Sequence, residues 1–405
     1  MRKGKRWLAA AVSAAMIVQS LASVGPVYAA DDGVSIADTF TDSSFRSYVS
    51  SNFDTDSNGY LSDAEISNVT SIDVSKCSPA ISSLNGVELF TNLSKLDCNE
   101  QSIRNLDIEN LENLEYIDVS SNRIDSLTLP VSAEKLTYLD ISGNKITSLT
   151  SLADYNNLVL LNANSTNLSS IDVSNMKGLK VLGVSGTTIS TLDLGSNMEL
   201  TTLYCDSMRS LPVLDVSGHE KLKNLYCAGA KSDSGVVVRS SITKLDVSGD
   251  IVLGSLDCSN SYVAEVNIDN TPALTTLDCS NTRLTSIDVS KNTSLSYLDV
   301  SSNVLGAVDF TANTALRELY VKDTGINKLD VSTLTNLVNL DASSNSLAEL
   351  DIASNSLLEK LYISDNNIQG IKLDGHPDLK ELEIDNNNLV AIDISVCPKL
   401  YGDDG

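Results

Sequence analysis

Residues 274–290 read LTTLDCSNTRLTSIDVS, and residues 295–310 read LSYLDVSSNVLGAVDF. The leucines of the first stretch recur 21 residues later in the second, as Leu274 and Leu295 show. The same spacing can be laid on the chain about fourteen times between Leu93 and Lys399. Tandem self-similarity at a period of roughly 20 to 29 residues is typical of a solenoid, in which each coil stacks on its neighbours. The sequence therefore predicts a repeat protein.

Counted from the first leucine, each unit has apolar residues at positions 1, 4, 6, 11, 14 and 16, and Asn or Thr is common at position 9. This arrangement is the leucine-rich-repeat pattern. Positions 4 and 6 alternate with polar positions 3, 5 and 7, which predicts one short strand per coil with one face buried. We expect a leucine-rich-repeat solenoid with a parallel β-sheet on one face and strands about 4.8 Å apart. Its array occupies residues 93–405, with about 14 repeats of 21–22 residues.

The second half of each unit has its own alternation of apolar and polar residues, for example at residues 171–173, 287–289 and 329–331. Such alternation indicates short extended or strand segments on the back rather than helices. Because front and back would then be about equally thick, we expect a weakly curved solenoid. An asparagine at position 9 can bond to the loop backbone of adjacent coils, so we interpret these residues as structural. They are Asn122, Asn144, Asn303, Asn345, Asn366 and Asn387.

Residues 1–29 have the features of a secretory signal peptide, because four basic residues precede an apolar run and a small-residue cleavage site. The segment carries four positive and no negative charges, so its removal would change the formal net charge from -25 to -29. We expect a secreted protein, extracellular or associated with the cell envelope, without a membrane span. The strong negative charge argues against nucleic acid or an anionic membrane surface as partner.

Residues 30–68 are predicted to form a helical cap with an EF-hand-like calcium loop, DTDSNGYLSDAE, at residues 54–65. Oxygen ligands fall at the first, third and fifth places of this loop, Gly at the sixth and Glu at the last, as calcium binding requires. The predicted ligands are Asp54, Asp56, Asn58, the carbonyl of Tyr60, Ser62 directly or through water, and Glu65. The alternative is an acidic surface turn that mimics the pattern. Because calcium-sensing EF-hands work in pairs and this loop is single, we expect one structural Ca2+ ion.

Residues 69–92 follow the repeat pattern in degenerate form, which is typical of a capping repeat. The order of helix, acidic loop and leucine-rich repeats resembles the internalin-like secreted proteins of Gram-positive bacteria, whose caps contain EF-hand-related helices. The resemblance covers nearly the whole mature chain and implies an extracellular binding protein. Repeat length and the Asp-Val-Ser sequence on the back depart from the internalin pattern.

Fourteen residues, 228–241, stand where the repeat pattern needs four. Insertions in solenoids map to loops on one face, often the binding face. A long surface loop also costs little closure entropy, so a merely tolerated insertion stays an open alternative.

Little in the sequence indicates catalysis. Five of the seven cysteines occupy position 6 and are expected to be reduced and buried; they are Cys98, Cys205, Cys227, Cys258 and Cys279. The two histidines fall on the back of the coil, and no nucleophile elbow or phosphate loop accompanies the serines. We therefore do not expect an enzyme.

Positions 3 and 5 of the strands hold seven of the thirteen tyrosines, interleaved with carboxylates. Tyrosine supplies the large, amphipathic contact area that binding surfaces need, although aromatic residues also suit an exposed strand for structural reasons. We predict that a partner binds this face at Tyr204, Tyr226, Asp257, Asp278, Tyr297, Asp299 and Tyr320.

The expected function is recognition of a macromolecule, in the first place a protein with a basic patch, by a monomeric secreted or cell-surface protein. One alternative is a structural or cation-collecting component of the cell envelope. Another is a polysaccharide-binding module, against which the lack of tryptophan counts, since the single Trp7 lies in the predicted signal peptide.

Overall fold

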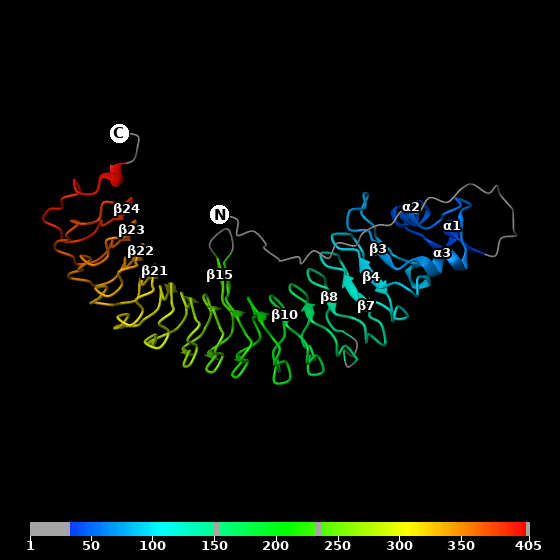
Figure 1. The fold of residues 1–405 in the computed structure, drawn as a ribbon, viewed down its shortest axis with the longest axis horizontal. Helices are drawn as coiled ribbons and strands as arrows, with labels where there is room; N and C mark the ends of the chain where they lie inside the picture. Colours follow the sequence, from blue (N-terminus) through cyan, green and yellow to red (C-terminus); the bar gives the residue numbers. More distant parts are fainter. Residues whose placement is uncertain (1–32, 150–151, 153, 232–235, 402–405) are drawn as a thin grey trace.

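The computed structural model describes residues 33–149, 152, 154–231 and 236–401. Within these residues the chain winds into a solenoid of successive coils, coloured from blue to red along its length in Figure 1. The predicted signal peptide, residues 1–29, lies outside the described residues. No helix in the described part of the chain is both long and apolar enough to cross a membrane.

One strand from each coil joins a sheet of 15 strands, and neighbouring strands are parallel. In order across the sheet they are β3 (Ser71–Asp73), β4 (Lys95–Asp97), β6 (Tyr116–Asp118), β8 (Tyr138–Asp140), β9 (Leu160–Asn162), β10 (Val181–Gly183), β11 (Thr202–Tyr204), β13 (Asn224–Tyr226), β17 (Ser255–Asp257), β19 (Thr276–Asp278), β20 (Tyr297–Asp299), β21 (Glu318–Tyr320), β22 (Asn339–Asp341), β23 (Lys360–Tyr362) and β24 (Glu381–Glu383). The strands pair in phase, so Leu277 of β19 lies between Leu256 and Leu298. The predicted parallel solenoid is confirmed.

The apolar positions of the repeat form a continuous core. Leu274, Leu277, Cys279 and Leu284 of one coil are all fully buried. Burial of one leucine side chain contributes about 1.5–3 kcal/mol, but a single coil cannot cover its own leucines. In-phase stacking is therefore essential, because a slip of one residue would turn the leucines to the solvent.

The asparagines at position 9 connect adjacent coils. Asn303 Nδ2 donates to the carbonyl oxygens of Cys279 at 2.8 Å and Val300 at 2.9 Å, and Asn303 Oδ1 accepts from the backbone N–H of Leu284 at 3.0 Å. The same bonds recur at Asn122, Asn144, Asn345, Asn366 and Asn387. Their predicted structural role is confirmed.

The back of the solenoid contains short strands in some coils. β5 (Asn105–Asp107) pairs with β7 (Ser126–Thr128), and β16 (Lys244–Asp246) lies between β12 (Val213–Asp215) and β18 (Glu265–Asn267). Residues 171–173, 287–289 and 329–331 form no strand. The back is therefore a mixture of strand and non-strand segments, without α-helices in the coils that the structure describes.

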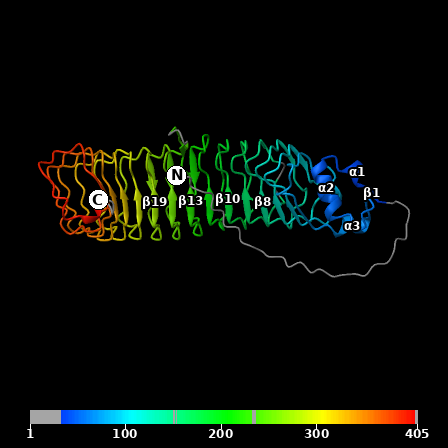
Figure 2. The same ribbon diagram turned by 90° about the horizontal axis from the view of Figure 1, so that it is seen from above.

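The solenoid forms an open arc in Figure 1, and Figure 2 shows that the large sheet lines its inner, concave side. This bend is more pronounced than the weak curvature expected from the sequence. A physical reason is that only the sheet side is hydrogen-bonded at strand spacing in every coil. The backs of most coils lack such a ladder, so they can spread apart.

A small cap covers the N-terminal end of the sheet, as predicted. It contains β1 (Val34–Ser35), α1 (Ile36–Thr39), α2 (Ser43–Asn52), β2 (Tyr60–Leu61), α3 (Asp63–Asn68) and, after β3, the 3-10 helix η1 (Val87–Leu89). Phe40 packs edge-on against Phe45, with ring centroids 5.5 Å apart, and parallel to Phe90 at 6.0 Å. All three rings are fully buried. They belong to the hydrophobic core that continues from the cap into the first coil.

The inserted residues contain an antiparallel hairpin of β14 (Ala230–Lys231) and β15 (Val237–Val238). Figure 1 shows this hairpin projecting on the concave side of the arc. Arg239 fixes its base, because Nη1 donates to the carbonyl oxygens of Ser261, at 2.9 Å, and of Asn281, while Nη2 donates to Asn281 Oδ1 at 2.5 Å. At the other end of the solenoid the described chain closes with the 3-10 helix η2 (Pro398–Tyr401).

Candidate functional site on the concave sheet

Six of the seven predicted partner-binding residues form one row across the concave sheet. Each is the last residue of its strand, and the strand register places them side by side in the order Tyr204, Tyr226, Asp257, Asp278, Asp299 and Tyr320. Tyr297 begins β20 and lies in the adjacent row, opposite Glu318 of β21. We use the name central row for the six residues of this row together with the neighbouring Tyr297. The sequence pattern thus places three aspartates between two groups of tyrosines.

The tyrosines of the central row pack on one another. The rings of Tyr204 and Tyr226 are stacked, with centroids 5.0 Å apart and planes 9° from parallel. Tyr297 and Tyr320 meet at 5.6 Å with tilted rings, and the Tyr320 hydroxyl donates to Glu318 Oε2 at 2.7 Å. Aromatic contacts of this kind fix the ring orientations, so flat apolar surfaces flank the aspartates on both sides.

The three aspartates are partly withdrawn from solvent. Burial raises the pKa of Asp278 to about 6, and the charge of Asp257 adds to this rise. A hydrogen bond from the Ser280 hydroxyl, 2.7 Å from Asp278 Oδ1, only partly opposes it. Burial also raises the pKa of Asp299, against hydrogen bonds from Ser301. A cation at this row would therefore stabilise the ionised carboxylates.

A similar group of tyrosines and aspartates lies at the N-terminal end of the sheet, but a lysine accompanies it. Tyr116 and Tyr138 stack with centroids 4.3 Å apart beside the aligned Asp97, Asp118 and Asp140. There, Lys95 Nζ lies 3.6 Å from Asp97 Oδ2 and 5.2 Å from the centroid of the Tyr116 ring. Among the residues that the structure describes, no lysine or arginine forms an ion pair with Asp257, Asp278 or Asp299.

The structure adds Asp206, which the sequence analysis missed, to this site. Burial raises its pKa to about 6, the backbone N–H of Ala228 lowers it, and the charge of Asp257 raises it further. Ala228 donates to Asp206 Oδ1 at 2.9 Å. Asp206 stands at position 7, next to the strand positions 3 and 5, and an acidic residue where most repeats have serine or asparagine could have indicated it.

The position-6 cysteines form a buried row beneath the same strands. Cys205, Cys227, Cys258 and Cys279 directly follow β11, β13, β17 and β19, which are neighbours in the sheet. All four are fully buried with free thiols, and the sulfur atoms of Cys258 and Cys279 lie 3.3 Å apart. A hydrogen bond with Cys205 and, next to it in importance, burial raise the pKa of the Cys227 thiol. The predicted inward position is confirmed.

The acidic loop at residues 54–65 begins just after α2 and ends in the first turn of α3. Carboxylate oxygens of Asp54, Asp56 and Glu65 lie within 4.8 Å of one another. Asn58 faces the same group, because its side-chain amide donates to Asp56 Oδ2 at 3.0 Å. Gly59 has a φ of 85°, which an L side chain would resist, and its N–H donates to Asp54 Oδ2 at 3.0 Å. Three carboxylates that converge in this way fit a hard divalent cation.

The remaining predicted ligands have structural contacts in this loop. Tyr60 pairs with Ser35 in the small sheet of β1 and β2. Ser62 caps α3 and donates from its hydroxyl to Glu65 Oε2 at 2.9 Å. Although burial favours the neutral acid, hydrogen bonds from Thr55 and Ser62 lower the pKa of Glu65 to about 2. Glu65 is therefore ionised at neutral pH, as a calcium ligand must be.

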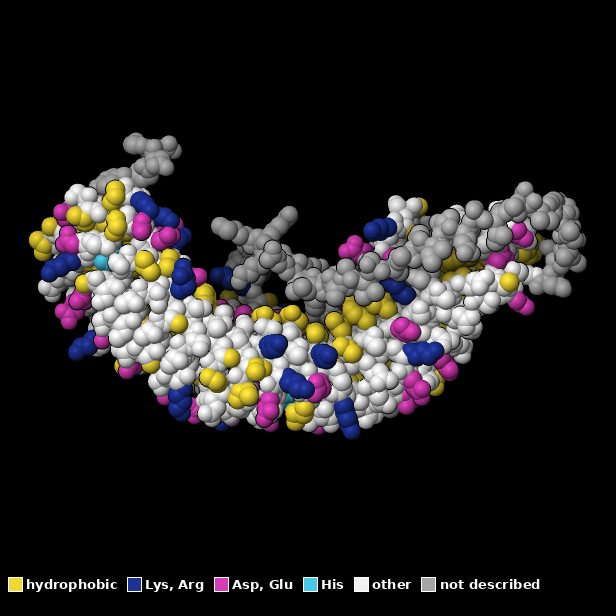
Figure 3. All heavy atoms as spheres, viewed as in Figure 1, with side chains coloured by type: hydrophobic (Ala, Val, Ile, Leu, Met, Phe, Trp, Pro, Cys, Tyr) yellow, Lys and Arg dark blue, Asp and Glu magenta, His cyan; other side chains and the backbone are white. Residues whose placement is uncertain are grey.

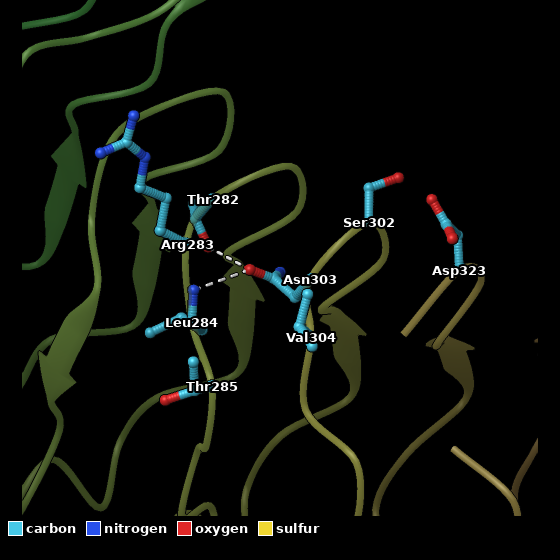
Figure 4. Close-up of a pocket in the computed structure, with 8 residues that line it drawn as sticks. All are labelled: Thr282, Arg283, Leu284, Thr285, Ser302, Asn303, Val304 and Asp323. Atoms are coloured by element: carbon cyan, nitrogen blue, oxygen red, sulfur yellow. Dashed lines mark hydrogen bonds between the residues drawn. The ribbon is translucent and has the colours of Figure 1, made fainter. Parts of the chain in front are cut away.

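A shallow pocket opens between neighbouring coils at the edge of the sheet. It is lined by Thr282, Arg283, Leu284, Thr285, Ser302, Asn303, Val304 and Asp323. Figure 4 shows Asn303 turned inward, where its oxygen accepts from Thr282 and Leu284, while Arg283 points away from it. The Arg283 guanidinium lies 4.2 Å from the ring centroid of Tyr262. The polar groups of this pocket thus serve the coil structure and do not converge on a ligand.

Family models and solved structures agree with the repeat pattern. Residues 112–154 match a family described as Leucine Rich repeats (2 copies), and residues 291–309 match one described as Leucine Rich repeat. A comparison with curated proteins gave no match.

Several solved structures share the fold. The functional domain of InlJ from Listeria monocytogenes, which includes a cysteine ladder, is 28% identical over 92% of this chain and 75% of that chain, with a TM-score of 0.72. The internalin InlF from the same species is 21% identical, with 91% and 96% of the chains covered and a TM-score of 0.57. YopM from Yersinia enterocolitica is 22% identical, with 80% and 70% covered and a TM-score of 0.58. The chain contains leucine-rich repeats and is structurally similar to internalins.

Proposed function

We propose that this chain is a secreted or cell-surface binding protein that holds a basic protein partner on its concave sheet, at the central row. The observation that carries the proposal is the row of Asp257, Asp278 and Asp299, which has no basic counterpart among the described residues and is flanked by tyrosine pairs. Like charges about 5 Å apart repel, so a basic side chain placed across them would relieve a cost that the isolated protein carries.

The surroundings of the central row suit a protein partner. Tyrosine rings offer apolar contact area with a polar tip, and the neighbouring aspartates would accept hydrogen bonds from arginine or lysine. The hairpin of β14 and β15 rises beside the same strands and would limit the approach of a partner from one side. Likeness to internalins agrees with a binding role and with the predicted secretion. A cation-collecting envelope component would use the carboxylates but would not need the tyrosines.

We also propose that the loop at residues 54–65 holds one structural Ca2+ ion. Asp54, Asp56, Asn58, the Tyr60 carbonyl and Glu65 would supply oxygen ligands, with Ser62 acting directly or through water. The convergence of three carboxylates supports this role. A bound ion would neutralise these charges and hold α2 against α3.

The partner and its site can be tested together. Envelope extracts and host proteins are passed over the immobilised wild-type protein with and without calcium, and retained proteins are identified by mass spectrometry. A retained basic protein is then titrated against two variants, Tyr226→Ala with Tyr297→Ala, and Asp278→Asn with Asp299→Asn. We expect each pair to weaken binding by about tenfold or more, and wild-type affinity to fall as salt rises.

A matched control is Asp309→Asn with Asp330→Asn, which removes the same charge from exposed aspartates of the solenoid. Unchanged affinity in both central-row pairs, with circular dichroism intact, would place the partner elsewhere. An equal loss of affinity in the control pair would mean that the net charge of the protein, and not the central row, determines binding. Retention of a polysaccharide instead of a protein would favour the alternative that the chain is a polysaccharide-binding module.

A further inference from the structure

We infer that the chain has a second interaction surface, on the side of the solenoid where the strands begin, that binds an acidic protein segment containing large apolar side chains. Lys177, Lys180, Lys221 and Lys223 define this surface, which we call the lysine flank. All four side chains are exposed. The inference does not depend on the function proposed for the concave sheet, because it concerns other residues of opposite charge.

The backbone fixes the spacing of the lysine flank. The N–H of Lys180 donates to the carbonyl of Val159 at 2.9 Å, that of Thr201 to Lys180 at 2.8 Å, and that of Lys223 to Thr201 at 2.9 Å. These residues therefore occupy successive rungs just before β9, β10, β11 and β13. Lys180 and Lys223 are two rungs apart, which is about 10 Å at strand spacing. This distance suits two acidic side chains of one extended segment.

The charge of the flank is opposite to that of the whole chain. In the coils of β10, β11 and β13, the strand-start edge holds these four lysines together with Glu199 and Glu220, a local excess of two positive charges, whereas the formal net charge of the chain is -25. Within the described residues, Lys221 is the one member of the four that forms an ion pair, with Glu199. Figure 3 shows dark blue side chains gathered beside yellow ones on the near side of the middle coils. Three lysines therefore remain available to an acidic partner.

Exposed apolar side chains accompany these lysines. Val159, Met198, Ile251 and Val252 are 37%, 48%, 50% and 37% exposed. They are four of the ten exposed large hydrophobic residues in the described part of the chain, and all four lie in the strand-start edge of five successive coils. The turn position of Met198 and Ile251 is occupied by threonine in three later coils, at Thr293, Thr314 and Thr335, and by proline or serine in others, at Pro272, Ser356 and Pro377. Exposed apolar side chains that gather on one side of a protein are typical of an interaction site.

The combination favours a protein over other polyanions. Met198, Ile251 and Val252 need an apolar counterpart to leave water, which a polyanionic sugar chain does not provide. Glu199 and Glu220 lie among the lysines and would be repelled by the uniformly negative surface of a membrane. A segment with acidic and large apolar residues complements both the lysines and the apolar side chains.

Selection from a peptide library tests the chemistry of the partner directly. A library of 12-residue peptides displayed on phage is selected on the wild-type protein and counter-selected on the variant Lys180→Glu with Lys223→Glu. We expect the enriched peptides to combine acidic and large apolar residues. Enrichment of no peptide, or of peptides without acidic residues, would overturn the inference.

A synthetic copy of the most enriched peptide is then titrated by fluorescence anisotropy. We expect Lys180→Glu with Lys223→Glu, and separately Met198→Ser with Ile251→Ser, to weaken binding by tenfold or more. The matched control, Lys328→Glu with Lys372→Glu, makes the same charge change at exposed lysines of later coils and should leave affinity within about twofold. An equal loss in the control, or flank-dependent binding to phosphatidylglycerol vesicles in place of the peptide, would contradict the assignment.

Discussion

At the scale of single residues, one buried side chain on the back of many coils donates hydrogen bonds to backbone carbonyl groups, and these side chains form a column along the solenoid. Asn197 Nδ2 donates to the carbonyl oxygens of Val173 and Met176, at 2.9 and 3.0 Å, in the preceding coil. Asn292, Asn313 and Asn355 make equivalent pairs of bonds. The same column contains both histidines, and each of their ring nitrogens lies against a backbone carbonyl. The histidines therefore have a structural role.

Asp250 is the exception in this column. Its side chain is fully buried, and neither carboxyl oxygen completes a hydrogen bond within the described residues. Burial raises the pKa of Asp250 to about 7, and the charges of Asp246 and Asp215 add to the rise. Burial and the nearby negative charges of Asp246 and Asp215 therefore favour the neutral acid.

We predict that Asp250→Asn stabilises the protein at pH 8 but has little effect near pH 4. Because the pKa is raised on folding, the stability that protonated Asp250 contributes is present at low pH and is lost as pH rises through about 7. Asparagine keeps its donors at all pH values, so the gain at pH 8 should be on the order of 2 kcal/mol. Urea unfolding across this pH range measures it. The exposed Asp374→Asn serves as control, and a pH-independent difference would contradict the prediction.

At the scale of elements, the acidic loop joins two short helices that cover the first coil. Its local sequence determines its shape, because Gly59 supplies the left-handed turn and Ser62 begins α3 with a reciprocal bond to Glu65. A calcium ion would add what the loop lacks, a positive charge among three carboxylates.

We predict that calcium raises the melting temperature of the wild-type protein and that Glu65→Ala abolishes the increase. An ion at about 100 times its dissociation constant adds about 2.7 kcal/mol to the folded state. The quantity compared is the calcium-induced shift, since Glu65→Ala also removes bonds from Thr55 and Ser62. Asp63→Asn, in the same loop but outside the predicted ligands, should keep the shift. An unchanged shift in Glu65→Ala would mean that the loop is only an acidic turn.

At the scale of the whole molecule, the buried cysteine row reports on the integrity of the central coils. The thiols of Cys205, Cys227, Cys258 and Cys279 can meet a reagent only when neighbouring coils separate. Burial and apolar surroundings also keep such thiols protonated and unreactive. By contrast, Cys77 in the first coil is only half-buried.

We predict that thiol titration of the native protein labels Cys77 first and leaves the position-6 cysteines unmodified. Denaturation without reductant should then expose five or more further thiols, because equivalent side chains of in-register strands lie side by side and suit a disulfide poorly. Mass spectrometry of the labelled peptides assigns each site. Absence of free thiols after denaturation would show that the row is oxidised.

The sequence alone determined the fold, the register and the row of tyrosines and aspartates on the sheet. A 21-residue period places equivalent positions side by side once the strands stack in phase, so Asp257, Asp278 and Asp299 had to align. The sequence likewise determined that the position-6 cysteines are buried, and it determined the shape of the acidic loop at residues 54–65. These features follow from local spacing and from the need of every coil to bury its leucines on its neighbours.

Only the tertiary structure decided the curvature, the desolvation of Asp206 and Asp278, the unsatisfied Asp250 and the lysine flank. Each depends on distances between coils, which a repeat pattern leaves free. In the sequence Asp250 resembles an exposed turn residue, and only the stacking of the coils buries its carboxyl group. The four lysines are scattered over residues 177–223. They form one surface only because the backbone hydrogen bonds before β10, β11 and β13 hold neighbouring coils side by side. Burial and proximity are properties of the stack, so residue identities alone do not contain them.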